Sequence, residues 1–244
     1  MKLIVAGSTG FVATEVIRQA LSIPAITSIV ALGRRPASEP QNTGPNADPT
    51  KLKSVILEDF GSEYPESVKK ELSGADACIW TIAITPSQLK TTPWEHTVKV
   101  CRDFAIRGLE TIAQLPRDGT AKKPLRFIYM SGNNAERDQT KKPMILGEYC
   151  LLRGEAESLI LEYAKKSNGA VEACIAKAGL ISSPEKPTPM LQKAFFAVIG
   201  LPKIQVSEIS AAMLRQVVNG FETDTLLNAD MVRDGQKFLA EHKL

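Results

Sequence analysis

Short runs of apolar residues alternate along this chain with longer segments in which apolar residues recur three or four positions apart. The short runs have the length and composition of buried strands, and the longer segments have the periodicity of amphipathic helices. Strands are therefore predicted at residues 3–6, 28–32, 53–57, 76–83, 125–131, 171–176 and 225–227. Helices are predicted at 10–21, 65–72, 93–115, 145–167, 189–199 and 207–221, and from 232 onward.

This alternation of strands and helices is typical of an α/β fold. Right-handed crossovers between parallel strands then favour a Rossmann-like, doubly wound parallel sheet of about seven strands with helices on both faces. The run at 76–83 is nearly all apolar, as expected of a strand whose two faces are both covered. Residues 36–50 are rich in proline, asparagine, serine and glycine and lack apolar periodicity, so we expect a surface loop there.

A glycine-containing segment joins the first predicted strand to the first predicted helix and reads Gly7-Ser8-Thr9-Gly10-Phe11-Val12-Ala13. Gly7 permits a tight turn, Gly10 lets the backbone approach a pyrophosphate, and Ala13 lets the helix pack against the strand. The helix N-terminus offers N–H groups and the positive end of its dipole to phosphate oxygens. The alternative is an ordinary strand–helix turn. We expect a dinucleotide to bind here, at Gly7, Ser8, Thr9, Gly10, Phe11 and Val12.

The composition is that of a globular protein, with 244 residues of which 43% are hydrophobic and 23% charged. We expect a single NAD(P)-binding domain over residues 1–244. Its dinucleotide-binding core is predicted at 1–180. A small C-terminal substrate-covering region, with the elements that close the fold, is predicted at 181–244.

Several classes of function are disfavoured by the same numbers. A net charge of +3 without a Lys/Arg-rich stretch does not favour nucleic acid as a partner. No apolar run reaches the roughly 18 residues of a membrane span, and the N-terminus lacks the features of a signal peptide, so a cytoplasmic protein is expected. Four scattered cysteines and two histidines make a metal site implausible and favour reduced, mostly buried thiols.

The end of the second predicted strand, where such a domain meets the adenosine ribose, carries Gly33-Arg34-Arg35. An acidic residue there would bind both ribose hydroxyls and repel a 2′-phosphate, whereas guanidinium groups form charge-assisted hydrogen bonds to phosphate. Arg34 and Arg35 therefore favour NADP(H) over NAD(H), unless they are only solvated loop charges. Asp59 is either a contact for the adenine amino group or a loop residue. Two residues at the end of the fourth predicted strand, Thr81 and Ala83, are expected to line the cofactor.

Four features together resemble an atypical short-chain dehydrogenase/reductase. They are Gly7-x-x-Gly10-x-x-Ala13, Gly33-Arg34-Arg35, Ser131 and Tyr149-x-x-x-Arg153-Gly-Glu-Ala-Glu157. The resemblance extends over nearly the whole chain, including residues 206–213, and is nearest to the NAD(P)H-binding NmrA-like and Tat-interacting-protein-like branches. Those branches mix reductases, redox-neutral enzymes and cofactor-binding regulators.

The resemblance implies a catalytic set of Ser131, Tyr149 and the residue at position 153. In the family, the serine orients the substrate carbonyl and the tyrosine donates a proton. A lysine four residues later favours the phenolate and holds the nicotinamide ribose. Here Arg153 replaces that lysine, and since a guanidinium is effectively never deprotonated, binding should survive better than proton turnover. The alternatives are that Tyr149 only packs and that Arg153 forms a surface charge pair with Glu155 and Glu157.

Further positions follow from the same resemblance. Ala178-Gly179 stands where the family places Pro-Gly beside the nicotinamide, so Ala178 and Leu180 are expected at the cofactor. Asn133 and Asn134 are candidates for substrate contact, and residues 182–196 for a substrate lid. The leading hypothesis is an NADP(H)-dependent reductase of a small organic substrate. A homodimer is a possible assembly. A redox-neutral isomerase, epimerase or cyclase and a non-catalytic NADP(H)-binding regulator are the alternatives.

Overall fold

The computed structural model describes residues 1–44, 46–117, 123–184 and 201–244. It confirms the predicted α/β fold, with a sheet of seven parallel strands in the order β3-β2-β1-β4-β5-β6-β9. The strands are β1 (Lys2–Ala6), β2 (Ser28–Gly33), β3 (Leu52–Ile56), β4 (Ala77–Trp80), β5 (Leu125–Gly132), β6 (Val171–Ala178) and β9 (Thr225–Leu226).

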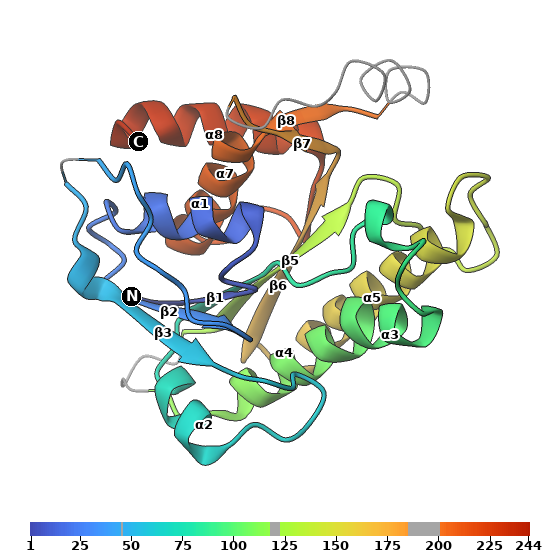
Figure 1. Cartoon of the computed structure of the whole chain (residues 1–244), viewed down its shortest axis with the longest axis horizontal. Coiled ribbons are helices and arrows are strands. Elements are labelled where there is room, and N and C mark those ends of the chain that lie inside the picture. The colour runs from blue at the N-terminus through green and yellow to red at the C-terminus, as the bar shows by residue number, and fades with distance from the viewer. Residues whose placement is uncertain (45, 118–122, 185–200) are drawn as a thin grey trace.

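Helices cover both faces of this sheet (Figure 1). One face carries α1 (Phe11–Ala20), α7 (Val206–Asn219) and α8 (Asn228–His242). The other carries α2 (Glu66–Leu72), α4 (Phe104–Gln114) and α5 (Gly147–Lys166), with the short α3 (Trp94–Val98) beyond α4.

The core has two hydrophobic clusters, one on each face of the sheet, because successive side chains of a strand point to opposite faces. In β1, Leu3 and Val5 join the hydrophobic cluster under α1 and α7, whereas Ile4 and Ala6 join the cluster under α4 and α5. Both sets are fully buried, which explains why the strand is a continuous apolar run.

The strand order places a topological switch at β1. The chain passes from β1 to β2 on one side and, after β3, returns to β4 on the other side of β1. Ligands of doubly wound sheets bind at the carboxyl ends of the strands beside such a switch. The segments that follow β1, β2, β4, β5 and β6 therefore define the candidate site.

Two predicted elements of the middle of the chain differ from the structure. The fourth strand ends at Trp80 rather than at 83, because its partner β1 ends at Ala6, opposite Trp80. The predicted helix over 93–115 consists of α3, a π-helical turn (Lys99–Asp103) and α4. Helical periodicity does not distinguish this turn, and π-helical turns often occur at functional sites.

The C-terminal part contains further corrections. Helix α7 begins at Val206, one residue before the predicted start, and the N–H of its N-cap residue Gln205 donates to Glu208. Helix α8 begins at Asn228, four residues before the predicted start. A two-stranded sheet of β7 (Leu180–Ser182) and β8 (Lys203–Gln205) was not predicted, since three-residue strands leave little pattern. The predicted helix at 189–199 lies outside the described residues.

Two further observations concern the whole fold. Within the described ranges, no helix is both long and apolar enough to cross a membrane. All four cysteines are free and buried, as predicted for their side chains.

Candidate functional site

The turn after β1 forms a cradle of main-chain groups. Gly7 has φ +87°, and its N–H donates to the Leu32 carbonyl at 2.9 Å, while the Gly10 N–H donates to the Gly7 carbonyl at 2.8 Å. Gly10 is the N-cap of α1 and provides no side-chain cap, and the first turn of α1 contains no acidic residue. The N-terminus of α1 therefore has the polarity and the access that an anion needs.

A Cβ atom at Gly7 would lie 2.6 Å from the Thr81 hydroxyl oxygen. That hydroxyl cannot easily move, because it donates to the Ala6 carbonyl at 2.8 Å. Glycine is required at position 7 both by the positive φ and by the close approach of the segment after β4. The N-terminus of α1, with neither a side-chain cap nor an acidic residue, fits the pyrophosphate of a dinucleotide.

Replacing Gly7 with alanine should weaken cofactor binding by about tenfold or more, because a Cβ only 2.6 Å from the Thr81 hydroxyl displaces the turn whose main-chain groups face the phosphates. Gly169→Ala is the matched control, since Gly169 also has positive φ (+81°) but lies in the turn before β6 with open space around its Cβ position. Titration calorimetry with NADPH measures the effect. Equal affinities in the two variants would contradict the assignment of the cradle.

The residues predicted for the adenosine end lie after β2 and β3. Arg34 and Arg35 are exposed, and neither has an ion-pair partner among the described residues. Asp59 accepts the Gly61 N–H at 2.8 Å and the Ser62 hydroxyl, and the hydrogen bonds from Ser62 and then Gly61 lower the pKa of its carboxyl. Since both Asp59 oxygens are used within its own loop, its contact with adenine stays a prediction.

The segment after β4 links the cradle to the catalytic candidates. The Thr81 N–H and hydroxyl both donate to the Ala6 carbonyl, at 3.0 and 2.8 Å. Ala83 is half-buried. The Ile84 N–H donates to the Cys101 thiol at 3.3 Å, and the Ile84 carbonyl accepts the Tyr149 hydroxyl at 2.8 Å. Cys101 belongs to the π-helical turn, so this turn anchors the segment against which Tyr149 is held.

Tyr149 and Arg153 lie one turn apart on α5, on the same side of the helix. Burial raises the pKa of the Tyr149 phenol, and the nearby Arg153 charge opposes that rise. Arg153 is only 3% exposed; its guanidinium lies 4.7 Å from the centre of the Tyr129 ring and donates to the Met130 carbonyl at 2.5 Å. Its Nε and Nη1 atoms are buried without a partner in the described structure.

The alternative interpretation of Arg153 as a surface charge pair was wrong. Glu155 pairs with Arg102 at 2.9 Å, and Glu157 pairs with Arg137 at 2.7 Å. Residues two apart on a helix point in different directions, so Arg153 faces the sheet while Glu155 faces Arg102 of the π-helical turn. Glu157 lies on the same side as Arg153 but pairs with other cations. Arg153 is instead a buried cation next to the two tyrosines.

Ser131 is buried at the end of β5, and its hydroxyl donates to Glu157 at 2.5 Å. Glu157 is fully buried and also pairs with Arg137 at 2.7 Å and with Lys177 at 3.4 Å. The cluster of Ser131, Glu157, Arg137 and Lys177 was not predicted from the sequence. The available signal was the position of Glu157, one further helical turn after Tyr149 and Arg153 on α5.

The remaining predicted residues lie where β5 and β6 end. The Asn133 N–H donates to the Ala178 carbonyl at 2.7 Å, and the side-chain amide of Asn133 donates to Asn134 at 2.9 Å. The Leu180 N–H donates to the Pro202 carbonyl at 2.8 Å. The structure thus brings residues 131–134 and 178–180 to one edge of the sheet, together with the Tyr149 end of α5. It places Arg34 and Asp59 on the neighbouring ends of β2 and β3.

The sequence and the structure were compared with those of known proteins. No family model matches the sequence, and no curated protein matches it. Among solved structures, vestitone reductase from alfalfa is 20% identical, with a TM-score of 0.65 over 93% of this chain and 76% of that one. The dTDP-glucose 4,6-dehydratase DesIV from Streptomyces venezuelae, with NAD and TYD bound, is 13% identical, with a TM-score of 0.67 over 98% and 80%.

A third solved structure is UDP-glucuronic acid 4-epimerase from Bacillus cereus in complex with UDP-glucuronic acid and NAD. It is 14% identical, with a TM-score of 0.64 over 93% of this chain and 77% of that one. At these identities the likeness shows the fold. The chain therefore shares the Rossmann-like fold of these solved structures, two of which contain NAD. The resemblance to NmrA-like proteins and the preference for NADP(H) stay predictions.

Proposed function

We propose that this protein is an NADP(H)-dependent reductase of the short-chain type, acting on a carbonyl, imine or activated double bond of a small organic substrate. The observation that carries the proposal is the pair of Tyr149 and Arg153 at the carboxyl edge of the sheet. Tyr149 donates to the segment that closes over Gly7, and Arg153 donates to the Met130 carbonyl of β5. A phenol with an adjacent buried cation is suited to general acid catalysis.

Each part of the site has a role in this proposal. The cradle at residues 7–12 holds the pyrophosphate, and Arg34 and Arg35 hold the 2′-phosphate. The buried positive charge of Arg153 lies beside Tyr149 and favours its phenolate form. A bound nicotinamide would supply the hydride.

Tyr149 donates a proton to the substrate atom that gains negative charge when the hydride is transferred, such as the carbonyl oxygen or the imine nitrogen. The positive charge of Arg153 stabilises the phenolate that remains, and solvent returns the proton, because the guanidinium does not release one. In this structure the Ser131 hydroxyl donates to Glu157 and the Tyr149 hydroxyl donates to the Ile84 carbonyl. When a substrate binds, each hydroxyl exchanges that acceptor for the substrate, Tyr149 as the proton donor and Ser131 as the group that orients the substrate carbonyl.

The pH dependence of the two reaction directions should differ. Because burial raises the pKa of Tyr149 above its ordinary value near 10, the phenol stays protonated through neutral pH. Reduction needs the phenol and should be constant between about pH 6 and pH 9, whereas oxidation of the alcohol needs the phenolate and should rise with pH, about tenfold per unit. Initial rates in both directions measure this. A reduction rate that falls with an apparent pKa below 8 would exclude Tyr149 as the donor.

Cofactor preference is tested by thermal shift with NADPH and NADH. We expect NADPH to raise Tm by several degrees more than NADH, since a binding free energy gained by the folded state stabilises it. The double variant Arg34→Gln/Arg35→Gln should lose that difference and keep the NADH shift. Equal shifts with both cofactors in the unaltered protein would refute the preference for NADP(H).

One observation favours a second candidate, a non-catalytic NADP(H)-binding regulator. The three groups of the catalytic set are all hydrogen-bonded within the protein: Ser131 to Glu157, Tyr149 to the Ile84 carbonyl and Arg153 to the Met130 carbonyl. A regulator predicts cofactor binding without NADPH consumption over any carbonyl panel. Following absorbance at the NADPH band over such a panel separates the two candidates.

A further inference from the structure

A hollow of about 270 Å³ opens beside Tyr149. Two segments far apart in sequence form it: the stretch between β4 and α3, and the stretch that leads into α5. The lining residues used below are Leu89, Thr92, Trp94, Lys142, Leu146 and Tyr149. Because Tyr149, the residue proposed as proton donor, is one of its lining residues, the hollow is a candidate for the substrate site.

The chemistry of the lining is mainly apolar and aromatic. Trp94 is 46% exposed and Leu146 is 45% exposed, so both present apolar surface to the hollow and its mouth. The adjacent Met144 is fully exposed and Ile145 is about half exposed. Apolar groups gathered at the surface in this way mark a binding site more often than a plain surface.

The charges of the hollow cancel. The aliphatic stem of Lys142 packs on Gly147, where a Cβ atom would lie 2.6 Å from Lys142 Cγ, and its ammonium group pairs with Glu148. Among the described lining residues, Lys142 is the one cation and Glu148 the one carboxylate. A diphosphate would therefore find no uncompensated positive charge here.

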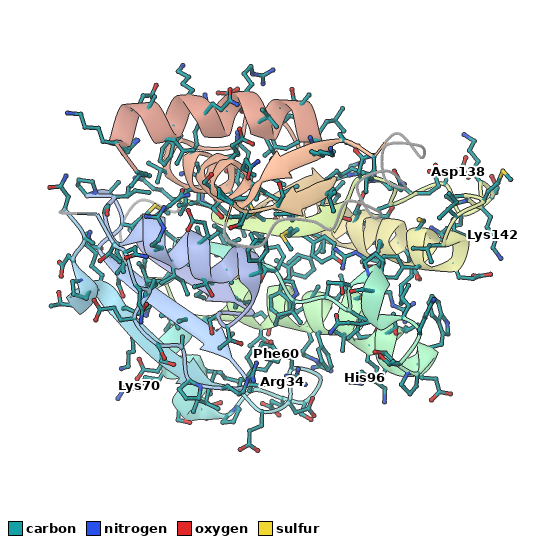
Figure 2. The ribbon with its side chains drawn as sticks, turned by 45° about the horizontal axis from the view of Figure 1, so that its top comes forward. Arg34, Phe60, Lys70, His96, Asp138 and Lys142 are labelled. Atoms are coloured by element: carbon teal, nitrogen blue, oxygen red, sulfur yellow. The ribbon has the colours of Figure 1, made fainter. Side chains whose placement is uncertain are left out.

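The hollow is also separate from the residues assigned to the cofactor phosphates. Figure 2 shows Lys142 at the end of the molecule that carries the loop before α5, well away from Arg34 at the end of β2. The pocket volume lies just below the roughly 300–1,000 Å³ of sites for drug-sized ligands, so its occupant is small.

We infer that this hollow binds the substrate as a neutral, flat aromatic molecule of about two fused rings, with its ring system between Trp94 and Leu146 and its polar group toward Tyr149. This inference rests on the proposed function for the role of Tyr149. If the inference is correct, nucleotide sugars, which are bound in several solved structures that share the fold, are not substrates of this protein.

Binding is tested by titration calorimetry of the full-length protein with 2-naphthol and, separately, with UDP-glucose. The variant is Leu146→Asp, at the N-cap of α5. The control is Leu159→Asp, because Leu159 is 38% exposed within α5 but does not line the hollow. Leu146 has a left-handed backbone (φ +53°), which aspartate adopts more readily than leucine, so the variant should fold. Equal unfolding temperatures check this.

We expect 2-naphthol to bind the unaltered protein and Leu159→Asp alike, Leu146→Asp to bind it at least about tenfold more weakly, and UDP-glucose not to bind. Binding of UDP-glucose, or equal binding of 2-naphthol to both variants, would overturn the inference. A third outcome would also overturn the inference: 2-naphthol does not bind, and sedimentation shows a dimer that Leu146→Asp dissociates. The surface around Leu146 would then be assigned to a second copy of the chain.

The same measurements separate this inference from the proposed function, because binding is read without cofactor or turnover. If 2-naphthol binds at the hollow but no aromatic ketone consumes NADPH, the reductase proposal fails and the inference stands. If 2-tetralone is reduced with the same KM in Leu146→Asp as in Leu159→Asp, the reductase proposal stands and the inference fails.

Discussion

Replacing Tyr149 with phenylalanine is expected to lower kcat by about 10²–10⁴-fold, the usual contribution of a positioned general acid. The change removes one hydroxyl, which donates to the Ile84 carbonyl at 2.8 Å, from a residue that lines the 270 Å³ hollow. The ring remains to pack beside Arg153, so the affinity for NADPH should be unchanged. Steady-state rates and calorimetric titration of NADPH measure the two quantities.

Tyr163→Phe is the matched control for this experiment. Tyr163 lies on the same helix, α5, and is partly exposed, but it is far along the helix from the site. Its variant should keep both turnover and NADPH affinity. If Tyr149→Phe turned over as fast as Tyr163→Phe, Tyr149 would not be the proton donor, and the interpretation of Tyr149 as a packing residue would hold.

Replacing Glu157 with glutamine is expected to destabilise the protein by about 3 kcal/mol, because breaking a buried ion pair leaves an uncompensated charge. Glu157 is fully buried, and the side chain of Lys177, one of its two cationic partners, is only 13% exposed. The amide that replaces the carboxylate also has N–H groups facing the Arg137 and Lys177 donors. Urea-induced unfolding measures the loss of free energy.

Glu155→Gln is the control, two residues earlier on α5. Its partner is Arg102, and both side chains are partly exposed, so the pair should contribute little in water. Ser131→Ala alone should have a smaller effect than Glu157→Gln, since the carboxylate keeps its two cations. Equal unfolding free energies for Glu155→Gln and Glu157→Gln would show that the buried cluster does not stabilise the link between β5 and α5.

Much of the fold could be predicted because its signals are local. A strand covered on both faces is nearly all apolar, and so β1, β2 and β5 were located to within about one residue from their apolar runs. The glycine turn could also be recognised, because Gly7 and Gly10 meet steric demands within the same seven residues.

Boundaries set by a distant partner could not be predicted in this way. The end of β4 depends on where β1 ends, more than seventy residues earlier, and Trp80 pairs with Ala6. The short strands β7 and β8 exist only because they pair with each other.

For the candidate site, the sequence by itself determined which chemical groups are present and how they are spaced along α5: the phenol of Tyr149, the guanidinium of Arg153 and the carboxylate of Glu157 follow one another at intervals of one turn. Only the tertiary structure decided what each group contacts. The Met130 carbonyl, the Ser131 hydroxyl and the Ile84 carbonyl come from other strands and loops, 23, 26 and 65 residues away. Periodicity is a property of one helix, whereas a hydrogen-bond partner depends on which elements the sheet brings together.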